Sequence, residues 1–290
     1  MRVLVIGGSG LVGTNIVSLV SEADAEIYAT YRETPVDHAG IELDKTNAER
    51  TQTVVQEVNP DLIVDTAAFH AVDDCETERD QAWSVNATGT RNVAVAANDT
   101  NVHLVYLSTD YVFPGKPAET PYVESDSVSP LNYYAETKYA AEQAAKIADR
   151  ATILRPSVIY GLASRNFVTW ALGELEEGNE LTIVNDQTSA PTYAPDLAEA
   201  CLKVFKRELT GLYHATGPQS INRYEFTKVL AEEFDFNTEL VDPISTEEFG
   251  QEAPRPEDST LDSSCLYEAI NYDFKSPREA FVEMHDQTQS

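Results

Sequence analysis

Residues 133–138 of this 290-residue chain read YYAETK, two tyrosines followed closely by a lysine. On a helix, side chains four positions apart return to nearly the same face. Tyr134 and Lys138 can therefore meet, whereas Tyr133 stands five positions from the lysine and points elsewhere. A tyrosine and a lysine one turn apart are common on solvated helices, so the pair identifies a reacting site only in company with other groups.

The next candidate reacting groups follow a predicted buried strand. Residues 104–115 read LVYLSTDYVFPG, in which Ser108, Thr109 and Asp110 come after an apolar run. Ligands of open α/β sheets bind beyond the carboxyl ends of the strands. We expect Tyr134 to protonate a carbonyl oxygen as hydride reaches its carbon, and Thr109 to hydrogen-bond the same oxygen. A nearby ammonium and a cationic nicotinamide should lower the pKa of Tyr134 from its ordinary value of about 10.

A glycine-rich turn indicates the cofactor. The segment Gly7-Gly8-Ser9-Gly10-Leu11-Val12-Gly13 follows the apolar run VLVI and opens a predicted helix. Glycines here permit a tight turn and a close backbone approach to a pyrophosphate, which the helix N-terminus attracts. The strand–turn–helix context therefore predicts a dinucleotide, whose nicotinamide ribose Lys138 should hold. The small residues of 66–68 follow the fourth strand and let the cofactor lie against the sheet edge.

The end of the second predicted strand bears on which dinucleotide is bound. It reads Thr30-Tyr31-Arg32, where NAD-selective sites usually place an acidic residue for the ribose hydroxyls. An arginine can instead hold a 2′-phosphate, so the sequence favours NADPH and leaves NADH as an alternative. Asp44 is placed to meet the adenine edge. The residues predicted to bind the cofactor are Gly7, Gly10, Leu11, Val12, Gly13, Arg32, Asp44, Thr66, Ala67, Ala68, Leu107, Tyr134, Lys138 and Ser157.

Short β-branched runs alternate with helical stretches through the first half of the chain. Strands are predicted at 3–6, 26–31, 41–43, 62–64, 102–107 and 152–154, and helices from the glycines to about 20 and at 47–58, 79–98 and 131–148. This alternation indicates an α/β fold with a Rossmann-type, doubly wound parallel sheet.

The pattern becomes irregular after Pro156, which suggests a second lobe. Helices are predicted near 166–177, 195–207 and 222–235, strands at 181–184 and 211–214, and a charged loop and one short helix at the end. We expect residues 1–155 to form the NAD(P)-binding domain, with returns near 181–215, and residues 156–290 to form mainly a smaller substrate-binding lobe.

The composition excludes several classes of protein. No apolar run reaches the ~20 residues of a membrane span, and the N-terminus leads straight into glycines, so we expect a cytoplasmic protein without a membrane partner. Cys75, Cys201 and Cys265 lie far apart without CxxC spacing and suit neither disulfides nor zinc. We expect no metal. The sequence leaves the number of subunits open, a homodimer included.

The charge is extreme, with 49 acidic against 20 basic residues and a formal net charge of −29. The acidic residues are spread along an otherwise ordinary apolar pattern, so this is not a disordered acidic tail. Such a charge argues against nucleic-acid binding. We hypothesise that the protein comes from a salt-loving organism, because at 1 M salt the Debye length falls to about 3 Å and self-repulsion is screened.

The chain resembles the extended short-chain dehydrogenase/reductases in its glycine loop, its YxxxK pair and the threonine that ends the fifth strand. It is more closely similar to the dTDP-4-dehydrorhamnose reductases over nearly its whole length. The segments that carry this resemblance are DTAAFHAVDDCE (65–76), SVNATGTRNVA (84–94), STDYVFPG (108–115), RPSVIYG (155–161), VNDQTSAPTYAPDLA (184–198), GLYH (211–214) and RPEDSTLD (255–262). STDYVF and NDQ…APTYA are fairly specific to that branch.

This resemblance implies a function and a set of residues. The function is NADPH-dependent reduction of the 4-keto group of a nucleotide-activated deoxysugar, dTDP-4-dehydrorhamnose or a close relative, for surface polysaccharide or glycoprotein synthesis. The implied catalytic residues are Thr109, Tyr134 and Lys138. Asn86 is implied to support the active-site helix. The residues expected near the substrate are Asp110, Val158, Asn166, Arg255 and Ser259.

Three departures from the family pattern affect the expected contacts. Val158 stands where bacterial reductases tend to carry a tryptophan, so the sugar or base contact should differ. Residues 65–68 read DTAA rather than NAAA. Some members hold magnesium through glutamates, one of them in the first helix, but this helix begins Thr14-Asn15.

Two other functions remain open. A nucleotide-sugar epimerase or dehydratase would oxidise and re-reduce its substrate without releasing cofactor, but dehydratases of this fold need an acidic pair beside the threonine. Here Tyr111 follows Asp110, so the pair is absent. A non-catalytic nucleotide-binding regulatory subunit is the other alternative, against which the intact Thr109, Tyr134 and Lys138 argue.

The charge hypothesis gives a direct prediction for stability. We expect the melting temperature to rise between low and multimolar KCl, because salt screens the repulsion among the excess carboxylates. Thermal unfolding followed by circular dichroism at both salt concentrations measures this. Equal melting temperatures would count against the hypothesis.

Overall fold

A seven-stranded parallel sheet organises the computed structural model, which describes residues 1–21, 25–36 and 40–289. The strand order is β11-β6-β5-β4-β1-β2-β3. The strands are β1 (Arg2–Ile6), β2 (Glu26–Tyr31), β3 (Gly40–Glu42), β4 (Leu62–Asp65), β5 (His103–Leu107), β6 (Ala151–Arg155) and β11 (Gly211–His214). The order reverses direction between β1 and β4, which is where doubly wound sheets bind their ligands. The predicted α/β fold is confirmed.

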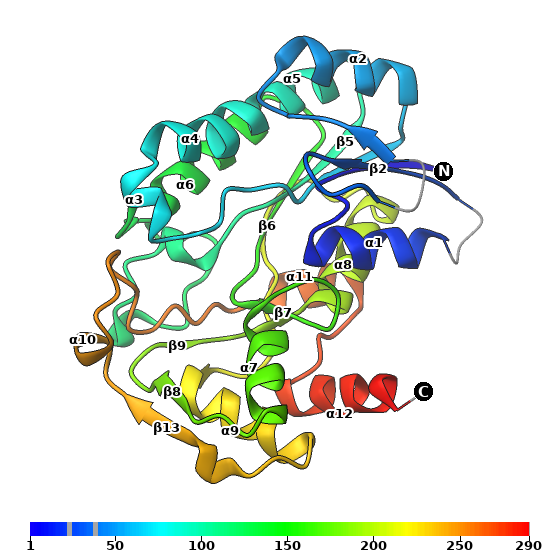
Figure 1. Cartoon of the computed structure of the whole chain (residues 1–290). Helices are drawn as coiled ribbons and strands as arrows, with labels where there is room; N and C mark the ends of the chain where they lie inside the picture. Colours follow the sequence, from blue (N-terminus) through cyan, green and yellow to red (C-terminus); the bar gives the residue numbers. More distant parts are fainter. Residues whose placement is uncertain (22–24, 37–39, 290) are drawn as a thin grey trace.

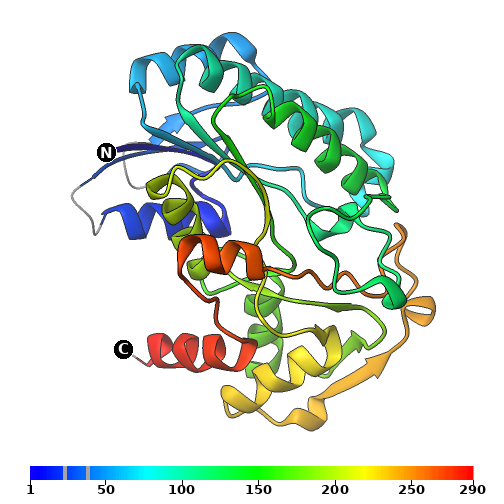
Figure 2. The same ribbon diagram turned by 180° about the vertical axis from the view of Figure 1, so that it is seen from behind.

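Helices cover both faces of this sheet (Figure 1 and, from behind, Figure 2). One face packs against α2 (Ala48–Val58), α5 (Thr90–Asp99) and α6 (Tyr133–Ala145), and the other against α1 (Leu11–Ser21), α8 (Ala194–Lys206) and α11 (Ser264–Ile270). Strands β4, β5 and β6 are buried at every position. A parallel strand covered on both faces has no polar side, which explains why these runs are mainly apolar rather than alternating, although each includes buried polar residues such as Asp65, His103 and Arg155.

A smaller lobe lies below the sheet in Figure 1 and has its own core. It contains α7 (Phe167–Glu176), α9 (Arg223–Glu233), α12 (Pro277–Thr288) and the parallel pair of β8 (Leu181–Val184) with β13 (Val241–Ile244). Two short pairs join it to the main sheet region: β7 (Ile159–Tyr160) with β10 (Thr192–Tyr193), and β9 (Thr188–Ser189) with β12 (Ile221–Asn222). Helix α8 and strand β11 pack on or extend the main sheet, whereas β8 pairs within the lobe.

The helix predicted at 79–98 follows the expected path but is not regular. It consists of α4 (Arg79–Trp83), a π-helical segment at Ser84–Gly89 and α5, and the short α3 (Asp74–Thr77) precedes it. π-segments of this kind often occur at functional sites, and Asn86 lies inside this one.

The helix that carries Tyr134 and Lys138 begins at Tyr133, two residues later than predicted. Asn132 caps it, since its side-chain oxygen accepts a hydrogen bond from the Ala135 N–H at 2.9 Å. An asparagine at this position is a strong start signal.

The prediction of one short final helix was wrong, because α11 and α12 both follow the charged loop. Helix α11 ends where Asn271 adopts a left-handed conformation (φ 49°), which separates it from α12. The sequence reading also missed β13, α10 (Thr246–Phe249) and three short 3₁₀ turns at Asp110–Val112, Pro117–Glu119 and Thr238–Leu240. Within the described residues, no helix combines the length and the apolar character needed to cross a membrane.

Candidate active site

The glycine loop between β1 and α1 has the geometry of a phosphate cradle. Gly7 has a φ of +88°, and a Cβ at Gly13 would stand 2.2 Å from the Gly7 carbonyl oxygen. The loop is tied to β2, because the Gly8 N–H donates to the Thr30 carbonyl at 2.8 Å. The first amides of α1 lack intrahelical acceptors, as at every helix start. This bare backbone at a helix N-terminus fits the pyrophosphate of a dinucleotide. Leu11 and Val12 form the first turn above it.

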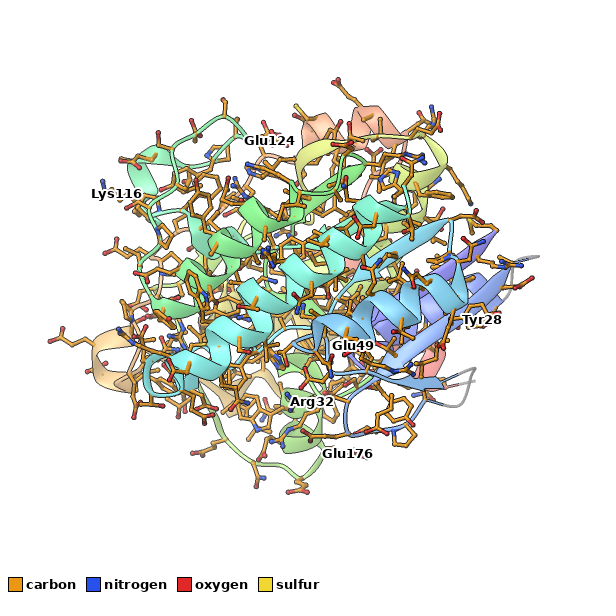
Figure 3. All side chains as sticks on the ribbon, turned by 90° about the horizontal axis from the view of Figure 1, so that it is seen from above. Tyr28, Arg32, Glu49, Lys116, Glu124 and Glu176 are labelled. Atoms are coloured by element: carbon orange, nitrogen blue, oxygen red, sulfur yellow. The ribbon has the colours of Figure 1, made fainter. Side chains whose placement is uncertain are left out.

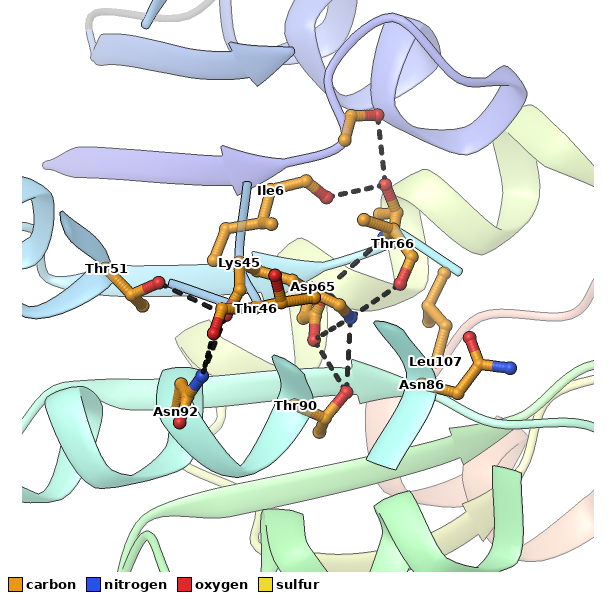
Figure 4. Close-up of polar contacts among 12 residues, drawn as sticks. Ile6, Lys45, Thr46, Thr51, Asp65, Thr66, Asn86, Thr90, Asn92 and Leu107 are labelled. Atoms are coloured by element: carbon orange, nitrogen blue, oxygen red, sulfur yellow. Dashed lines mark hydrogen bonds and ion pairs between the residues drawn. The ribbon is translucent and has the colours of Figure 1, made fainter. Parts of the chain in front are cut away.

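The end of β4 closes one side of this cradle. The Thr66 hydroxyl donates to the Ile6 carbonyl at 2.9 Å and to the Gly7 carbonyl at 3.1 Å, as Figure 4 shows. Ala67 and Ala68 follow and are half-buried. The loop and the end of β4 therefore form one surface at the point where the strand order reverses.

A buried ion pair lies directly beneath this surface. The Lys45 ammonium donates to both Asp65 carboxylate oxygens at 2.9 and 3.0 Å, to the Ala67 carbonyl at 2.6 Å and to the Thr90 hydroxyl at 3.2 Å. The two charged side chains are 4% and 0% exposed. The Lys45 stem lies against Gly89, where a Cβ would stand 2.7 Å from Lys45 Cγ. Lys45 thus ties the end of β4 to Thr90 of α5, as Figure 4 shows, and also contacts the π-segment at Gly89.

Sequence reasoning missed Lys45. Its one available signal was Asp65, a charged residue at the end of a buried strand. A buried carboxylate requires a partner, and the DTAA departure should have prompted a search for a cation.

Asn86 links the cradle to the helix that carries the reacting tyrosine. Its side-chain oxygen accepts from the Phe69 N–H at 2.8 Å, and its amide donates to the Phe69 carbonyl at 3.0 Å and to the Thr137 hydroxyl at 2.9 Å. Thr137 in turn donates to the Tyr134 carbonyl at 2.7 Å. Asn86 is buried, so these contacts are shielded from water. This geometry supports the predicted positioning role.

Thr109 and Asp110 follow β5 in a buried polar network. Thr109 donates to one Asp110 carboxylate oxygen at 3.1 Å, and Ser157 and Ser259 donate to the other at 2.7 and 2.5 Å. Burial raises the pKa of Asp110, while the serine and threonine hydrogen bonds oppose that rise. The network joins the main sheet to the loop before α11, and in this structure both Asp110 oxygens are already engaged.

Lys138 is buried and has no carboxylate partner among the described residues. Its side chain donates to the Leu107 carbonyl at 2.6 Å and lies 4.5 Å from the centre of the Tyr106 ring. The residue is 3% exposed. Burial, assisted by the positive charge of Lys45, lowers the pKa of Lys138 to about 7.

Tyr134 and Tyr133 face different surroundings. The Tyr134 ring meets the Tyr111 ring edge-on, with centroids 6.3 Å apart, on the side of Thr109 and Asp110. The Tyr133 ring lies under the Arg79 guanidinium at 4.7 Å. The two neighbouring tyrosines thus project to separate places, as the helical spacing predicts.

The pKa of Tyr134 moves opposite to our expectation. Burial raises it, and Asp110 raises it further, while a hydrogen bond from Thr109 opposes the rise. The Lys138 ammonium is directed to the strand end instead and does not lower it. A raised pKa keeps the phenol protonated at neutral pH, which suits a proton donor.

The two residues predicted to meet the adenosine end of the cofactor lie on the surface. Arg32 is about half exposed and binds Glu33 through Nε at 3.0 Å and Nη2 at 2.6 Å. Figure 3 shows Arg32 on the exterior. Asp44 is exposed and accepts a hydrogen bond from the Thr46 N–H at 2.9 Å. Neither residue is joined to the network around Tyr134.

Of the residues predicted to lie near the substrate, Ser259 and Arg255 lie in the loop before α11, whereas Asn166 lies at the start of α7. Ser259 belongs to the Asp110 network described above, and Arg255 pairs with Asp73 at 2.9 Å at the loop near α3. Asn166 caps α7 instead: its oxygen accepts from the Val168 N–H, and its amide donates to the Gly161 carbonyl at 2.7 Å. Both the oxygen and the nitrogen of the Asn166 side-chain amide are therefore already hydrogen-bonded.

Val158 carries an unusual backbone. Its φ of +40° lies in the left-handed region, which is a genuine outlier for a β-branched residue. Such strain persists only where the surroundings impose it and concentrates at ligand sites. The Thr192 N–H, at 2.9 and 3.2 Å from the Ser157 and Val158 carbonyls, holds this turn.

Comparisons with known proteins agree with this geometry. The family model described as the RmlD substrate binding domain matches residues 1–290. The dTDP-4-dehydrorhamnose reductase of Escherichia coli is 32% identical over 274 residues, covering 91% of this chain and 90% of that protein. The spore coat polysaccharide biosynthesis protein SpsK of Bacillus subtilis is 33% identical over 269 residues, covering 92% and 91%. The dTDP-4-dehydrorhamnose reductase of Bacillus anthracis, solved in complex with NADP, superposes with a TM-score of 0.90 at 34% identity and 99% coverage of both chains.

The buried ion pair leads to a prediction for stability. Lys45→Met leaves the Asp65 carboxylate buried without its cation, so we expect the free energy of unfolding to fall by about 3–5 kcal/mol. The matched double variant Lys45→Met/Asp65→Asn removes both charges and should recover most of this loss. Urea unfolding followed by circular dichroism measures both. A single variant as stable as the wild type would contradict the structural role of the pair.

Proposed function

We propose that this chain, which belongs to the RmlD substrate binding domain family, reduces the 4-keto group of dTDP-4-dehydrorhamnose or a close relative with NADPH. It is an NAD(P)H-dependent oxidoreductase, and sugar-nucleotide 4-keto reduction is the chemistry of its family. The observation that carries the proposal is the position of Lys138, which lies against the Leu107 carbonyl at the carboxyl end of β5, two residues before Thr109, on the helix that also carries Tyr134.

The chain's own residues fit a dinucleotide. Bound NADPH supplies the hydride. Gly7 and Gly13 permit the close packing of the loop that presents the start of α1 to its diphosphate, and the end of β4 flanks the loop. Lys138, at the end of β5, is placed for the nicotinamide ribose. For Arg32 to hold a 2′-phosphate, its guanidinium must leave Glu33, an exposed pair of little intrinsic strength.

Proton transfer falls to Tyr134. Its raised pKa keeps the hydroxyl protonated, so it can donate to the carbonyl oxygen while a C–H bond forms at the carbon. Thr109, the second residue after β5, would turn its hydroxyl from Asp110 to hold the same oxygen. The carbonyl π bond breaks, the new O–H takes the phenol proton, and solvent then restores the phenol. Asn86 and Thr137 keep Tyr134 oriented through the backbone of α6.

One assay tests the proposal. The protein is incubated in high salt with dTDP-4-dehydro-6-deoxy-L-mannose and NADPH, and the absorbance of the reduced cofactor is followed, with NADH in parallel. We expect one NADPH to be consumed for each sugar reduced, and a slower reaction with NADH. Product without net cofactor consumption would indicate an epimerase, and binding without turnover would indicate a regulatory subunit.

The tyrosine assignment predicts an unequal pair of variants. Tyr134→Phe should lower kcat by about 10²–10⁴, the usual contribution of a general acid. Tyr133→Phe, which changes the ring under Arg79, should lower kcat by less than about tenfold. Steady-state kinetics on both variants measure the difference, and melting temperatures control for folding. Comparable losses in the two variants would show that the acid is misassigned.

A further inference from the structure

Arg223, the first residue of α9, has an unusual environment for this acidic chain. Among the described arginines that are not exposed, Arg150, Arg155 and Arg255 each pair with a carboxylate. Arg223 is half-buried and forms no such pair in the part of the chain that the structure describes. Its guanidinium instead lies 5.2 Å from the centre of the Phe167 ring.

A partly buried cation without a counterion is costly to keep. Removing a guanidinium from water without a charge partner carries a desolvation cost, and its five donors normally find acceptors. The chain has 49 acidic residues from which a partner could have been drawn. The free charge of Arg223 therefore suggests that its partner is an anion from outside the chain.

The backbone places Arg223 at the substrate side of the site. Its N–H donates to the Gln187 carbonyl at 3.2 Å, and β12, which ends one residue before it, pairs with Thr188 and Ser189 of β9. The Ser259 N–H donates to the Thr188 carbonyl at 3.0 Å, and the Ser259 hydroxyl donates to Asp110. A continuous series of contacts thus joins the start of α9 to Asp110, the residue after Thr109.

The side chain of Arg223 reaches the same place. Its positive charge acts on the Tyr111 phenol, whose ring stands edge-on to Tyr134. Burial raises the pKa of Tyr111, and the positive charges of Arg223 and Arg255 oppose that rise. Both guanidiniums therefore act on one aromatic ring next to the proton donor.

The chemistry of a nucleotide sugar requires a proton donor and a cationic group at two different places, as Tyr134 and Arg223 are. The diphosphate is attached at C1 of the hexose, and the 4-keto group lies across the ring from it. A proton donor at the C4 oxygen and an anion-binding group one ring away are what such a substrate needs. Guanidinium groups bind phosphate oxygens in a planar, bidentate manner.

We propose that Arg223 binds the diphosphate of the nucleotide-sugar substrate together with Arg255. This inference rests on the proposed function and names the residue that recognises the charged part of the substrate. Arg223 is a binding residue and takes no part in the proton transfer.

Calorimetric titration of the full chain saturated with NADP⁺ tests this assignment. The probes are dTDP and thymidine, at one fixed KCl concentration. We expect Arg223→Gln to weaken dTDP binding by about 10- to 100-fold, the usual effect of losing hydrogen bonds between charged groups, and to leave thymidine binding unchanged. Arg223→Lys should fall between the wild type and the glutamine variant, and it keeps the test valid if the glutamine variant does not fold.

Arg207→Gln is the matched control. Arg207 follows α8, is exposed and has no carboxylate partner among the described residues, so this variant changes the net charge equally. We expect its dTDP affinity to stay within about twofold of wild type, because exposed charges act weakly at high salt. Equal losses in the Arg207 and Arg223 variants would overturn the proposal, since they would show a general charge effect.

Kinetics separate this inference from the proposed function. In Arg223→Gln, we expect KM for the nucleotide sugar to rise about 10-fold or more while KM for NADPH stays the same. Wild-type protein that reduces the sugar, with Arg223→Gln unchanged in KM and dTDP affinity, overturns the inference alone. Wild-type protein that neither reduces the sugar nor binds dTDP overturns both. Equal weakening of dTDP and thymidine would place Arg223 at the nucleoside and also contradict the proposal.

Discussion

A buried ammonium without a carboxylate partner is the feature on which the rest of this site depends. Two lysines are buried at the carboxyl edge of the sheet, and they differ in what neutralises them. Asp65 neutralises Lys45, which serves structure. Within the described part of the chain, Lys138 contacts the Leu107 carbonyl and the Tyr106 ring but no carboxylate, so the protein bears the cost of desolvating its charge. A fold accepts such a cost where the charge is needed by a ligand, and the surrounding contacts must then hold the lysine in place.

Those contacts form a connected set rather than a list of separate bonds. Lys45 joins the end of β4 to the π-segment, Asn86 joins the π-segment to α6, and α6 carries both reacting side chains. On the other side of the site, Asp110 follows β5 and accepts hydrogen bonds from Ser157 and from Ser259, which lies in the loop before α11. Because each link is buried, water cannot replace a lost partner, and a change at one link should be felt at the reacting groups.

Periodicity and local chemistry were sufficient to predict much of this structure from the sequence. Apolar runs such as VLVI and LIV (62–64) mark strands covered on both faces, and the glycine loop marks the turn between a strand and a helix. The four-residue spacing of Tyr134 and Lys138 predicts their shared helix. Pairings between distant segments were not predictable: Lys45 and Asp65 stand twenty residues apart and Asn86 and Thr137 fifty-one. Nothing local to Val158 signals its left-handed backbone, and nothing local to Arg223 shows that it lacks a carboxylate.

The direct test of this account is the titration of Lys138 in solution. Protein labelled with ¹³C at the lysine Cε is titrated by NMR without cofactor, and the Lys138 resonance is assigned by its loss in Lys138→Met. Because burial lowers the pKa of the folded lysine from 10.5 to about 7, its ammonium form should be lost as the pH rises through neutrality. A Lys138 resonance that titrates near pH 7 is the predicted result. One that titrates above pH 10, like an exposed lysine, would contradict the account.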